Sequence, residues 1–430
     1  MTSELVTLLG NREVGRLRQH RGRVSFEYDD AWQGSTEAYP LSLSMPIVEK
    51  RHPHATVNPF LWGLLPDNEF ILERWAARFQ VSAGNAFSLL EKVGEDCAGA
   101  VRFVSPDRLS TVTVNRGRVE WLNERQVADR LRELRSDASA WRRADDTGQF
   151  SLAGAQPKIA LTFDGKRWGI PAGPIPTTHI LKPGATGLEG HAENEHFCLA
   201  LARDLGLPVV HSLPVTFEDQ VAIAVERYDR IRRSGRAVRV HQEDFCQALG
   251  IHPVQKYENE GGPGARAIVG VLRESSAVPT DDVKTFVDAL VFSWIMAATD
   301  GHAKNYSLLI GAGGRTRLAP LYDVASALPY DTLRIRKLKL AMKIGGKYRL
   351  VEIGAYHFRK LAKELNLDGD ELISRAHAMA KTLPDAAASL LGQLRKKWPT
   401  FDMLQRLSKE LCDRAKFCEA ELSRARRAPD

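Results

Sequence analysis

The feature that most constrains this chain is a long apolar run over 283–298 that ends in a short cluster of polar residues. Val283, Phe286 and Leu290 recur at helical spacing, and further apolar residues fill the other faces. This pattern predicts a helix that is buried on nearly all sides. Such a helix would hold the polar run 299–305 rigidly, as in many binding and catalytic sites. Alternatively, Asp-Gly at 300–301 simply ends the helix, because this pair is common in turns.

Three residues in and after this run carry oxygen atoms suited to phosphoryl transfer. Asp300 can orient an acceptor hydroxyl and receive its proton, and the side chains of Asn305 and Asp323 can hold magnesium against nucleotide phosphates. Asn305 stands five residues after Asp300, the spacing between the catalytic Asp and the magnesium-binding Asn of protein kinases. The usual His-Arg lead-in is absent, since Ala298-Thr299 precedes Asp300. The sequence therefore predicts a kinase that uses ATP and Mg2+ and differs from ordinary eukaryotic kinases.

The region upstream has the pattern of an antiparallel sheet that covers phosphates. Residues 158–163 and 167–170 alternate like strands and are joined by the turn pair Asp164-Gly165. A dinucleotide-binding loop would instead open a helix, and a Walker loop would require Gly-Lys-Ser/Thr. The next strand-like run, 177–183, contains Lys182 where a kinase has its phosphate-contacting lysine. A solvated lysine at a strand end is the alternative interpretation.

Two neighbouring segments complete the predicted nucleotide site. A helix over 193–205 carries Glu195 on its first turn, which could pair with Lys182, although acids are favoured there by the helix dipole alone. The apolar strand that begins at Val221 runs into 226–230, where we expect the adenine-binding hinge.

Eight ordered blocks of the sequence together resemble the HipA family, the serine/threonine kinase toxins of bacterial toxin–antitoxin pairs. The blocks are SLAGAQPK (151–158), THILKP (178–183), AENEHFCLALARDLGL (192–207), VERYDR (225–230), HQEDFCQALG (241–250), KYENEGGPG (256–264), ATDGHAKN (298–305) and LAPLYDVASA (318–327). Residues 60–67 and 93–100 resemble the accessory domain of the same family. The resemblance thus covers nearly the whole chain.

The resemblance implies a role for each site residue. Asp300 is the proton acceptor, Asn305 and Asp323 bind Mg2+, and Lys182 holds ATP phosphates with the loop 153–158. The implied nucleotide-contacting residues are Ala153, Gly154, Ala155, Gln156, Pro157, Lys158, Lys182, Glu226, Arg227, Tyr228, His302, Asn305, Tyr322 and Asp323. His302 has the alternative role of ordering its loop. Pro157 removes one backbone donor from the phosphate cradle.

Ser151 matches a serine that HipA kinases phosphorylate on themselves. A phosphoserine adds a charge of about −1.5 to −2. At the edge of a loop that embraces ATP phosphates, this charge should repel the nucleotide and expel the loop, so the modification is expected to be an off-switch. The alternative is a turn serine that binds its own backbone.

The resemblance also implies partners. They are a HipB-like helix-turn-helix antitoxin, operator DNA bound through that antitoxin, and a protein substrate among the aminoacyl-tRNA synthetases, with glutamyl-tRNA synthetase favoured. The alternative is a catalytically weak corepressor that acts with its antitoxin. The basic segment 334–340 alternates like a strand and could attract an acidic partner or a nucleic acid, or it could be a solvated strand face. Basic side chains at 395–397 and 424–427 are candidates for phosphate contacts or ordinary charge on a helix surface.

Composition fits a cytoplasmic protein that uses no membrane. The chain has 430 residues and a net charge of +7, which permits contact with nucleic acid without requiring it. Its five cysteines are odd in number and contain no CxxC, which argues against a disulfide framework and a zinc site. The start lacks the features of a secretory signal, and no apolar run reaches about twenty residues.

The expected fold class is α+β, a two-lobed protein-kinase-like fold with an antiparallel β N-lobe, a helical C-lobe and a β-rich accessory domain. The expected boundaries are 1–107 for the accessory domain, 108–145 for a charged helical connection, 146–231 for the N-lobe and 232–430 for the C-lobe.

Overall fold

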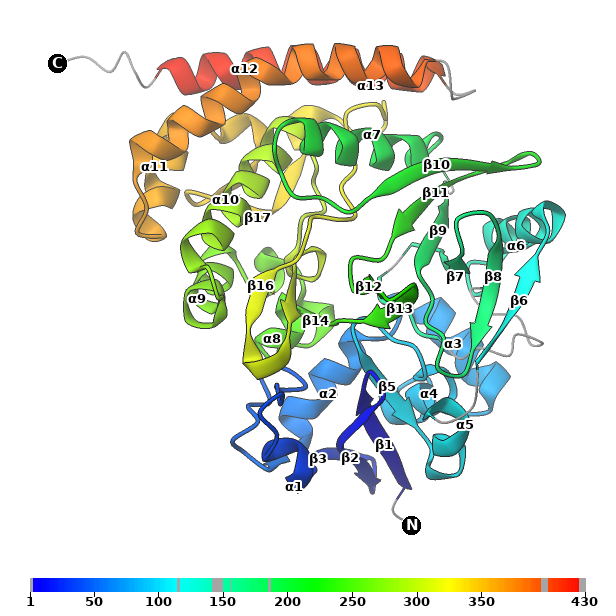
Figure 1. Ribbon diagram of the computed structural model, residues 1–430. Coiled ribbons are helices and arrows are strands. Elements are labelled where there is room, and N and C mark those ends of the chain that lie inside the picture. Colours follow the sequence, from blue (N-terminus) through cyan, green and yellow to red (C-terminus); the bar gives the residue numbers. More distant parts are fainter. Residues whose placement is uncertain are drawn as a thin grey trace. The chain divides into compact units, whose positions relative to one another are not determined.

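The computed structural model describes residues 3–113, 117–140, 150–154, 156–184, 187–395 and 401–424 (Figure 1). The chain divides into two compact units. Unit 1 comprises 1–185, 215–255 and 307–317, and unit 2 comprises 186–214, 256–306 and 318–430.

Unit 1 begins with a five-stranded antiparallel sheet in the order β4-β3-β2-β1-β5. Its strands are β1 (Ser3–Leu9), β2 (Arg12–His20), β3 (Arg23–Tyr28), β4 (Arg51–His52) and β5 (Val101–Val104). The helices among and after them are α1 (Asp30–Gln33), α2 (His54–Gly63), α3 (Glu69–Phe79), α4 (Ala86–Val93), η1 (Pro106–Arg108) and α5 (Leu109–Thr113). The alternation in β3, where Val24, Phe26 and Tyr28 are buried, places one face of the sheet against the core.

The second sheet of the chain has six strands in the order β10-β11-β9-β7-β8-β6. They are β6 (Arg118–Leu122), β7 (Ile159–Phe163), β8 (Trp168–Ala172), β9 (His179–Pro183), β10 (Ser212–Phe217) and β11 (Gln220–Glu226), with α6 (Glu124–Ser136) packed on β6, β9 and β11. The Asp164 carboxylate accepts hydrogen bonds from the amides of Lys166 and Arg167, which closes the β7–β8 turn. β6 lies inside the expected helical connection and pairs with β8.

The remaining strands of unit 1 form two small sheets. β12 (Arg230–Arg233) pairs with β13 (Arg236–Arg239), and β14 (His241–Asp244) pairs with β15 (Ser307–Ile310), beside β16 (Thr316–Leu318). The short helices here are α8 (Phe245–Ala248), η2 (Pro253–Gln255) and η5 (Ala312–Gly314).

One hydrophobic core serves both large sheets of unit 1. It contains Leu17 and Phe26 from the first sheet, Phe60 from α2, and Leu161 and Leu181 from the second sheet. Since apolar side chains from both sheets share one cluster, the N-terminal residues and the second sheet are parts of one packed body.

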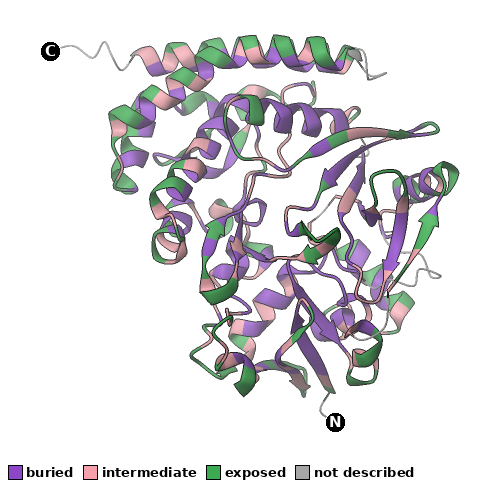
Figure 2. Cartoon of the chain, viewed as in Figure 1, coloured by how far each residue is buried: buried purple, intermediate pink, exposed green. Residues whose placement is uncertain are grey.

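Unit 2 is mainly helical. Its helices are α7 (His191–Asp204), α9 (Ala265–Ser275), α10 (Pro279–Met296), α11 (Ala355–Glu364), α12 (Gly369–Leu394) and α13 (Phe401–Arg424), with the hairpin β17 (Lys339–Ile344) and β18 (Lys347–Arg349). The single-turn helices are η3 (Glu258–Glu260), η4 (Ala303–Asn305), η6 (Ile335–Lys337) and η7 (Leu350–Glu352). α10 is buried along most of its length, with its exposed residues in the first two turns, whereas α12 and α13 carry a buried stripe beside an exposed one (Figure 2).

The predicted buried helix at 283–298 is confirmed as α10. Pro279 stands at its start, with Asp281 and Asp282 in the first turn, where they favour the positive end of the helix dipole. At its end, Ala297 adopts a left-handed conformation with φ 51° and its amide bonds to the Ser293 carbonyl. The chain thus leaves the helix sharply, directly before Asp300.

The strand-like interpretation of 334–340 is wrong for most of that segment. The amides of Lys337 and Leu338 bond to the carbonyls of Arg334 and Ile335, which makes the single turn η6, and the strand begins only at Lys339. Lys396, Lys397 and 425–427 lie outside the described residues. Within the described ranges, every helix is too short or too polar to cross a membrane.

Candidate active site

The loop that follows α10 is held by backbone hydrogen bonds around Asp300. The Asp300 carbonyl oxygen accepts from the His302 amide at 2.8 Å and from Asn305 Nδ2 at 2.7 Å. The Asp300 side chain is 67% exposed, so its carboxylate faces outward from a fixed backbone. This arrangement suits a group that must reach a substrate.

Asn305 and Asp323 have the donor atoms that Mg2+ prefers. Asn305 is largely buried, and its Nδ2 donates a hydrogen bond to the Asp300 carbonyl. This bond fixes the orientation of the side-chain amide, so that Oδ1 is the atom that could bind a metal ion. An amide oxygen and a carboxylate are hard oxygen ligands of the kind that bind Mg2+ beside nucleotide phosphates. The residues present therefore fit the ion.

Asp323 is brought to this loop through its neighbour. The Tyr322 hydroxyl donates a 2.7 Å hydrogen bond to the carbonyl of Lys304, the residue before Asn305. Asp323 itself has a left-handed backbone with φ 58°, a region that Asp tolerates better than most residues. Left-handed non-glycine residues gather at functional sites, where the surrounding structure imposes them.

A second set of hydrogen bonds fixes the segment after Asp323. The buried side chain of Asn194 on α7 donates to the Ser326 carbonyl at 2.7 Å and accepts from the Ser326 amide at 3.0 Å. The Ser326 hydroxyl then donates to the carbonyl of Met296, the last residue of α10, at 2.6 Å. The segment after Asp323 and the loop that carries Asp300 are thus both attached to the C-terminal end of α10.

His302 is buried beside Asp300. Its Nε2 lies 3.9 Å from Asp300 Oδ1, and the ring meets the Tyr257 ring edge-on at 4.9 Å between centroids. The backbone amide of His302 donates a hydrogen bond to the Asp300 carbonyl, so His302 helps to order the loop in this structure. Its contact with nucleotide stays a prediction.

In unit 1, Lys182 lies near the end of β9, a strand in the middle of the second sheet. Lys182 is paired with Ile223 of β11, and its side chain is buried. This buried position in a central strand differs from the solvated strand end that the alternative interpretation expected. Glu195, the acid weighed as its partner, lies buried in the first part of α7 in unit 2.

The predicted phosphate loop is packed against the N-terminal residues of unit 1. Ser151 is fully buried, and its amide donates to the Asp96 carbonyl. Gly154, which has φ 103°, forms an isolated β-bridge with Pro66. The Gly154 carbonyl accepts a hydrogen bond from the Asp67 amide at 3.1 Å.

Two side chains brace the far half of this loop. Lys158 is buried and its Nζ donates to the Ala153 carbonyl at 2.7 Å. Gln156 Nε2 donates to the Pro183 carbonyl, next to Lys182, at 3.3 Å. Pro157 is half-buried, and Ala155 lies outside the described residues.

The predicted adenine hinge begins where β11 ends. Glu226 is exposed, the Tyr228 hydroxyl donates to Gln242 Oε1 at 2.6 Å, and the Arg227 side chain turns inward. Arg227 donates to both carboxylate oxygens of Asp229, at 3.0 and 2.8 Å, so its guanidinium is committed to the structure of unit 1.

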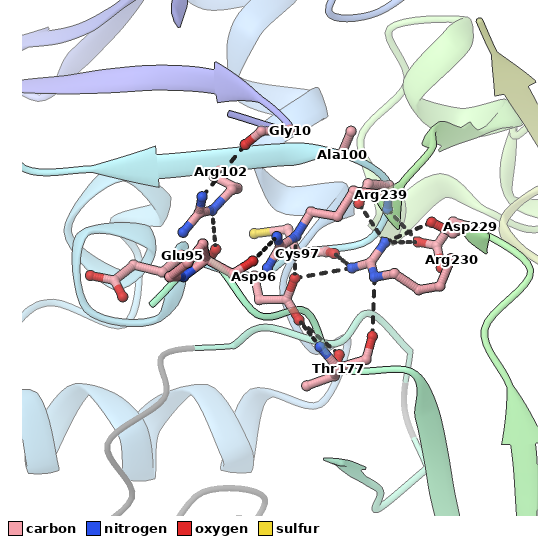
Figure 3. A network of polar contacts seen from close by, with 12 residues as sticks. Gly10, Glu95, Asp96, Cys97, Ala100, Arg102, Thr177, Asp229, Arg230 and Arg239 are labelled. Atoms are coloured by element: carbon pink, nitrogen blue, oxygen red, sulfur yellow. Dashed lines mark hydrogen bonds and ion pairs between the residues drawn. The ribbon is translucent and has the colours of Figure 1, made fainter. Parts of the chain in front are cut away.

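Arg227 belongs to a buried ionic network centred on Asp96. Figure 3 shows Asp96 in this network with Arg230, Arg239 and Thr177. The Asp96 carboxylate accepts from Arg230 at 3.0 Å, from Arg239 at 2.7 Å and from the Thr177 amide at 3.0 Å. Burial by itself would raise the pKa of the Asp96 carboxyl, but Arg239, Arg230 and Arg227 outweigh it and hold that pKa far below its usual range. The network joins the N-terminal residues to the predicted hinge.

Sequence reasoning missed three supports of the site: Asn194, Asp96 and Tyr257. Each lies inside a block that resembles the family, yet each acts on residues far away in sequence, such as Asp300 for Tyr257. The sequence offers no local signal for these supports: Asn194, for example, stands among other polar residues of α7, between Glu193 and Glu195.

Two domain models match the chain. The HipA N-terminal domain matches residues 5–104, and the HipA-like C-terminal domain matches residues 150–387. The first accounts for the five-stranded sheet and the helices around it. The second contains Ser151, Lys182, Asp300 and Asp323.

Individual relatives match over nearly the full length. The chain is 35% identical to the putative kinase Y4mE of Sinorhizobium fredii, over 89% of this chain and 93% of the relative. It is 30% identical to the serine/threonine-protein kinase toxin HipA of Shewanella oneidensis, over 91% of each. A solved structure of HipA with HipB and operator DNA from Shewanella oneidensis has a TM-score of 0.85 at 26% identity and covers 99% of this chain and 100% of that one. The expected fold class is thereby confirmed, and the chain belongs to the HipA family of serine/threonine-protein kinase toxins.

Proposed function

We propose that this chain is the toxin of a toxin–antitoxin pair and phosphorylates serine or threonine on a translation component, using ATP and Mg2+. The observation that carries the proposal is the joint placement of Asp300, Asn305 and Asp323 in one braced loop system of unit 2. An outward carboxylate beside two hard-oxygen ligands is the equipment that phosphoryl transfer requires of a protein.

The division of labour follows from the side-chain chemistry. Asp300 would receive the proton of the acceptor hydroxyl as that oxygen bonds to the terminal phosphorus of ATP, while the bond from this phosphorus to the bridging oxygen breaks and ADP leaves. Asn305 and Asp323 would hold Mg2+, which when bound neutralises charge on the phosphates. Lys182 pairs with the phosphates, and the 153–158 loop offers backbone amides, apart from Pro157, which has none to offer.

The adenine would lie against Glu226, Arg227 and Tyr228 through main-chain groups. The Arg227 guanidinium is engaged with Asp229, and its amide donates to the Thr178 carbonyl at 2.9 Å. Its carbonyl oxygen accepts from the Arg230 amide at 3.1 Å, and because a carbonyl can accept two hydrogen bonds, a second bond is what this residue could offer a nucleotide. His302 and Tyr322 complete the nucleotide side by ordering the loop that carries Asn305.

Ser151 is the proposed site of self-inactivation. Its hydroxyl is fully buried and donates to the Leu64 carbonyl at 2.7 Å. A phosphoryl group there would place negative charge against carbonyl oxygens in a space that holds only a hydroxyl. Phosphorylation therefore requires the loop to leave, and the modified loop cannot return to embrace ATP phosphates.

The proposed partners come from the family and from one relative. HipA of Shewanella oneidensis has been solved with HipB and operator DNA, and we extend a HipB-like antitoxin to this chain, with operator DNA reached through it. The proposed protein substrate is an aminoacyl-tRNA synthetase, with glutamyl-tRNA synthetase first to be tested, and the proposed place of action is the cytoplasm.

The test is intact-mass analysis of dephosphorylated protein before and after incubation with MgATP, followed by peptide mapping. The proposal expects one added phosphoryl group on Ser151, and none in Asp300→Ala. Adding purified synthetases to the Ser151→Ala variant then identifies the substrate, because this variant cannot inactivate itself. Protein that binds ATP but labels neither itself nor any synthetase would support the corepressor alternative instead.

A further inference from the structure

The Tyr257 hydroxyl donates a hydrogen bond of 2.6 Å to Oδ1 of Asp300, across 43 residues of sequence. Both residues belong to unit 2. The Nε2 atom of His302 lies 3.9 Å from the same oxygen, Oδ1 of Asp300. Both contacts therefore fall on Oδ1, and the opposite oxygen, Oδ2, belongs to a side chain that is mostly exposed.

Tyr257 is held in place from several directions. Its ring packs edge-on against the buried His302 ring, at 4.9 Å between centroids. The carbonyl of Tyr257 accepts from the Gly262 amide at 2.9 Å, and the preceding carbonyl, of Lys256, accepts from the Ala303 amide at 3.3 Å. The segment that carries the tyrosine is thus bonded directly to the loop that carries Asp300.

The residue after Tyr257 anchors the same segment on its other side. Glu258 accepts from the Lys343 amide at 2.7 Å and forms an ion pair with Lys343 Nζ at 3.1 Å. Gly261 closes the turn with φ 92°. A phenol fixed in this way can restrain a neighbouring side chain instead of following it.

Asp300 needs such a restraint. Its backbone is fixed, but an exposed carboxylate can rotate about its side-chain bonds, and a general base that is misplaced by about 1 Å loses on the order of a hundredfold in rate. A hydrogen bond to a carboxylate is stronger than one between neutral groups and can hold Oδ1 in one orientation. Binding of Oδ1 leaves Oδ2 for the acceptor hydroxyl.

We propose that Tyr257 is a positioning residue for phosphoryl transfer: it holds Asp300 by Oδ1 and directs Oδ2 toward the acceptor serine or threonine. This inference rests on the proposed function, because it assigns Tyr257 a role in the same reaction. The phenol touches neither phosphate nor acceptor and acts through Asp300.

The test compares Tyr257→Phe with the wild-type chain in the full-length protein. The phenylalanine keeps the ring against His302 and removes only the hydroxyl. Rates of self-phosphorylation at Ser151, measured against ATP concentration, give a limiting rate constant and a half-saturating ATP concentration, and rates on a synthetase substrate, where one is found, give the corresponding kcat and KM for ATP. We expect kcat to fall about tenfold to a hundredfold, the rate equivalent of the lost hydrogen bond, with the KM for ATP within about twofold of wild type.

Two controls separate positioning from general damage. Tyr356→Phe changes an exposed tyrosine on α11 and should leave kcat unchanged. In the Asp300→Asn background the added Tyr257→Phe change should have little further effect, because a residue that acts through the carboxylate has nothing left to position.

The outcomes distinguish this inference from the function on which it rests. Wild-type activity that depends on Asp300 but is unchanged in Tyr257→Phe overturns the inference and leaves the function standing. A rise in kcat, or a lower KM for the acceptor, also overturns it, since the phenol would then be competing for the acceptor's place. Absence of any Asp300-dependent phosphorylation in the wild-type chain overturns both.

Discussion

Ser151 is joined to Leu64 by a hydrogen bond of 2.7 Å from its hydroxyl to the leucine carbonyl, inside unit 1. The Ser151 amide makes a second bond, of 3.0 Å, to the carbonyl of Asp96. The loop proposed to cover ATP phosphates is therefore seated on residues from the N-terminal part of the chain. A phosphoryl group on Ser151 removes the hydroxyl donor of the first bond and places negative charge beside the Leu64 carbonyl.

The first prediction concerns Ser151→Asp. We expect this variant to bind MgATP at least about tenfold more weakly than wild type, because a carboxylate at this fully buried position would meet the Leu64 carbonyl oxygen with no proton to donate and should expel the loop. Isothermal titration with a non-hydrolysable ATP analogue measures the change. Ser151→Ala removes the hydroxyl without adding charge and should bind within about threefold of wild type. Equal affinity of the two variants would contradict the loop's role in nucleotide binding.

The second prediction concerns Asp323→Asn. Asn tolerates the left-handed backbone at φ 58°, so the variant should fold as the wild type does. It loses the negative charge that would hold Mg2+, and we expect phosphorylation to fall about a hundredfold or more, with partial recovery at raised Mg2+ concentration. The readouts are initial rate against Mg2+ and a thermal unfolding curve.

Asp413→Asn, an exposed change in the middle of α13, is the matched control and should leave both readouts unchanged. An active Asp323→Asn variant with unaltered dependence on Mg2+ would remove Asp323 from the proposed metal site.

The third prediction concerns Asp96→Asn. Loss of the carboxylate leaves Arg239 buried without its anion and takes from Arg230 one of its two carboxylate partners, the other being Asp229. Breaking a buried ion pair in this way costs about 3–5 kcal/mol. Urea unfolding at neutral pH should show a loss of this size, whereas Asp107→Asn, on the exposed η1 turn, should unfold as the wild type does. Because the pKa of Asp96 is depressed, its contribution exists above the ordinary Asp pKa and declines as pH falls below about 4.

The fourth prediction concerns Glu243, a fully buried acid on β14. It accepts from the Ser42 hydroxyl at 2.5 Å and from the Leu43 amide at 2.8 Å, yet burial raises its pKa to about 8. The folded state therefore holds this proton more tightly than the unfolded chain does, and the stability that results is complete below pH 4.5 and is lost as pH rises toward 8.

Glu243→Gln removes this proton equilibrium. We expect the free energy of unfolding of the wild type to fall, relative to the variant, by on the order of a few kcal/mol between pH 5 and 8. Urea unfolding at three pH values in this range measures it, with the exposed Glu260→Gln as the control that should track the wild type. Parallel profiles for wild type and Glu243→Gln would show that this carboxyl has an ordinary pKa.

Local patterns predicted those parts of the structure that local physics controls. The helix that became α10 and the strands β7, β8 and β9 were predictable because each has a clear period of apolar residues. The spacing of Asp300 and Asn305 was informative because a short loop closes over five residues, and the structure ties these two residues by a side-chain bond.

Tertiary contacts determined what the patterns could not predict. β6 has mostly exposed side chains and exists as a strand because it pairs with β8, so its sequence alone carries little signal. Arg227 was expected at a nucleotide, yet its guanidinium is drawn inward by Asp96 and Asp229, which come from distant and adjacent sequence respectively. The bond between Tyr257 and Asp300 likewise depends on a packing arrangement that no local period encodes.

The seating of the phosphate loop on Leu64 and Asp96 has a consequence for how the chain matures. The ribosome delivers residues 64 and 96 before residue 151, so the two carbonyls that hold Ser151 belong to chain that is already made when the loop emerges. Damage to the N-terminal segment by proteolysis or mutation would then disarm the kinase without touching Asp300. Loss-of-toxicity mutations selected in growing cells should accordingly gather around these two carbonyl positions as well as in the catalytic loop.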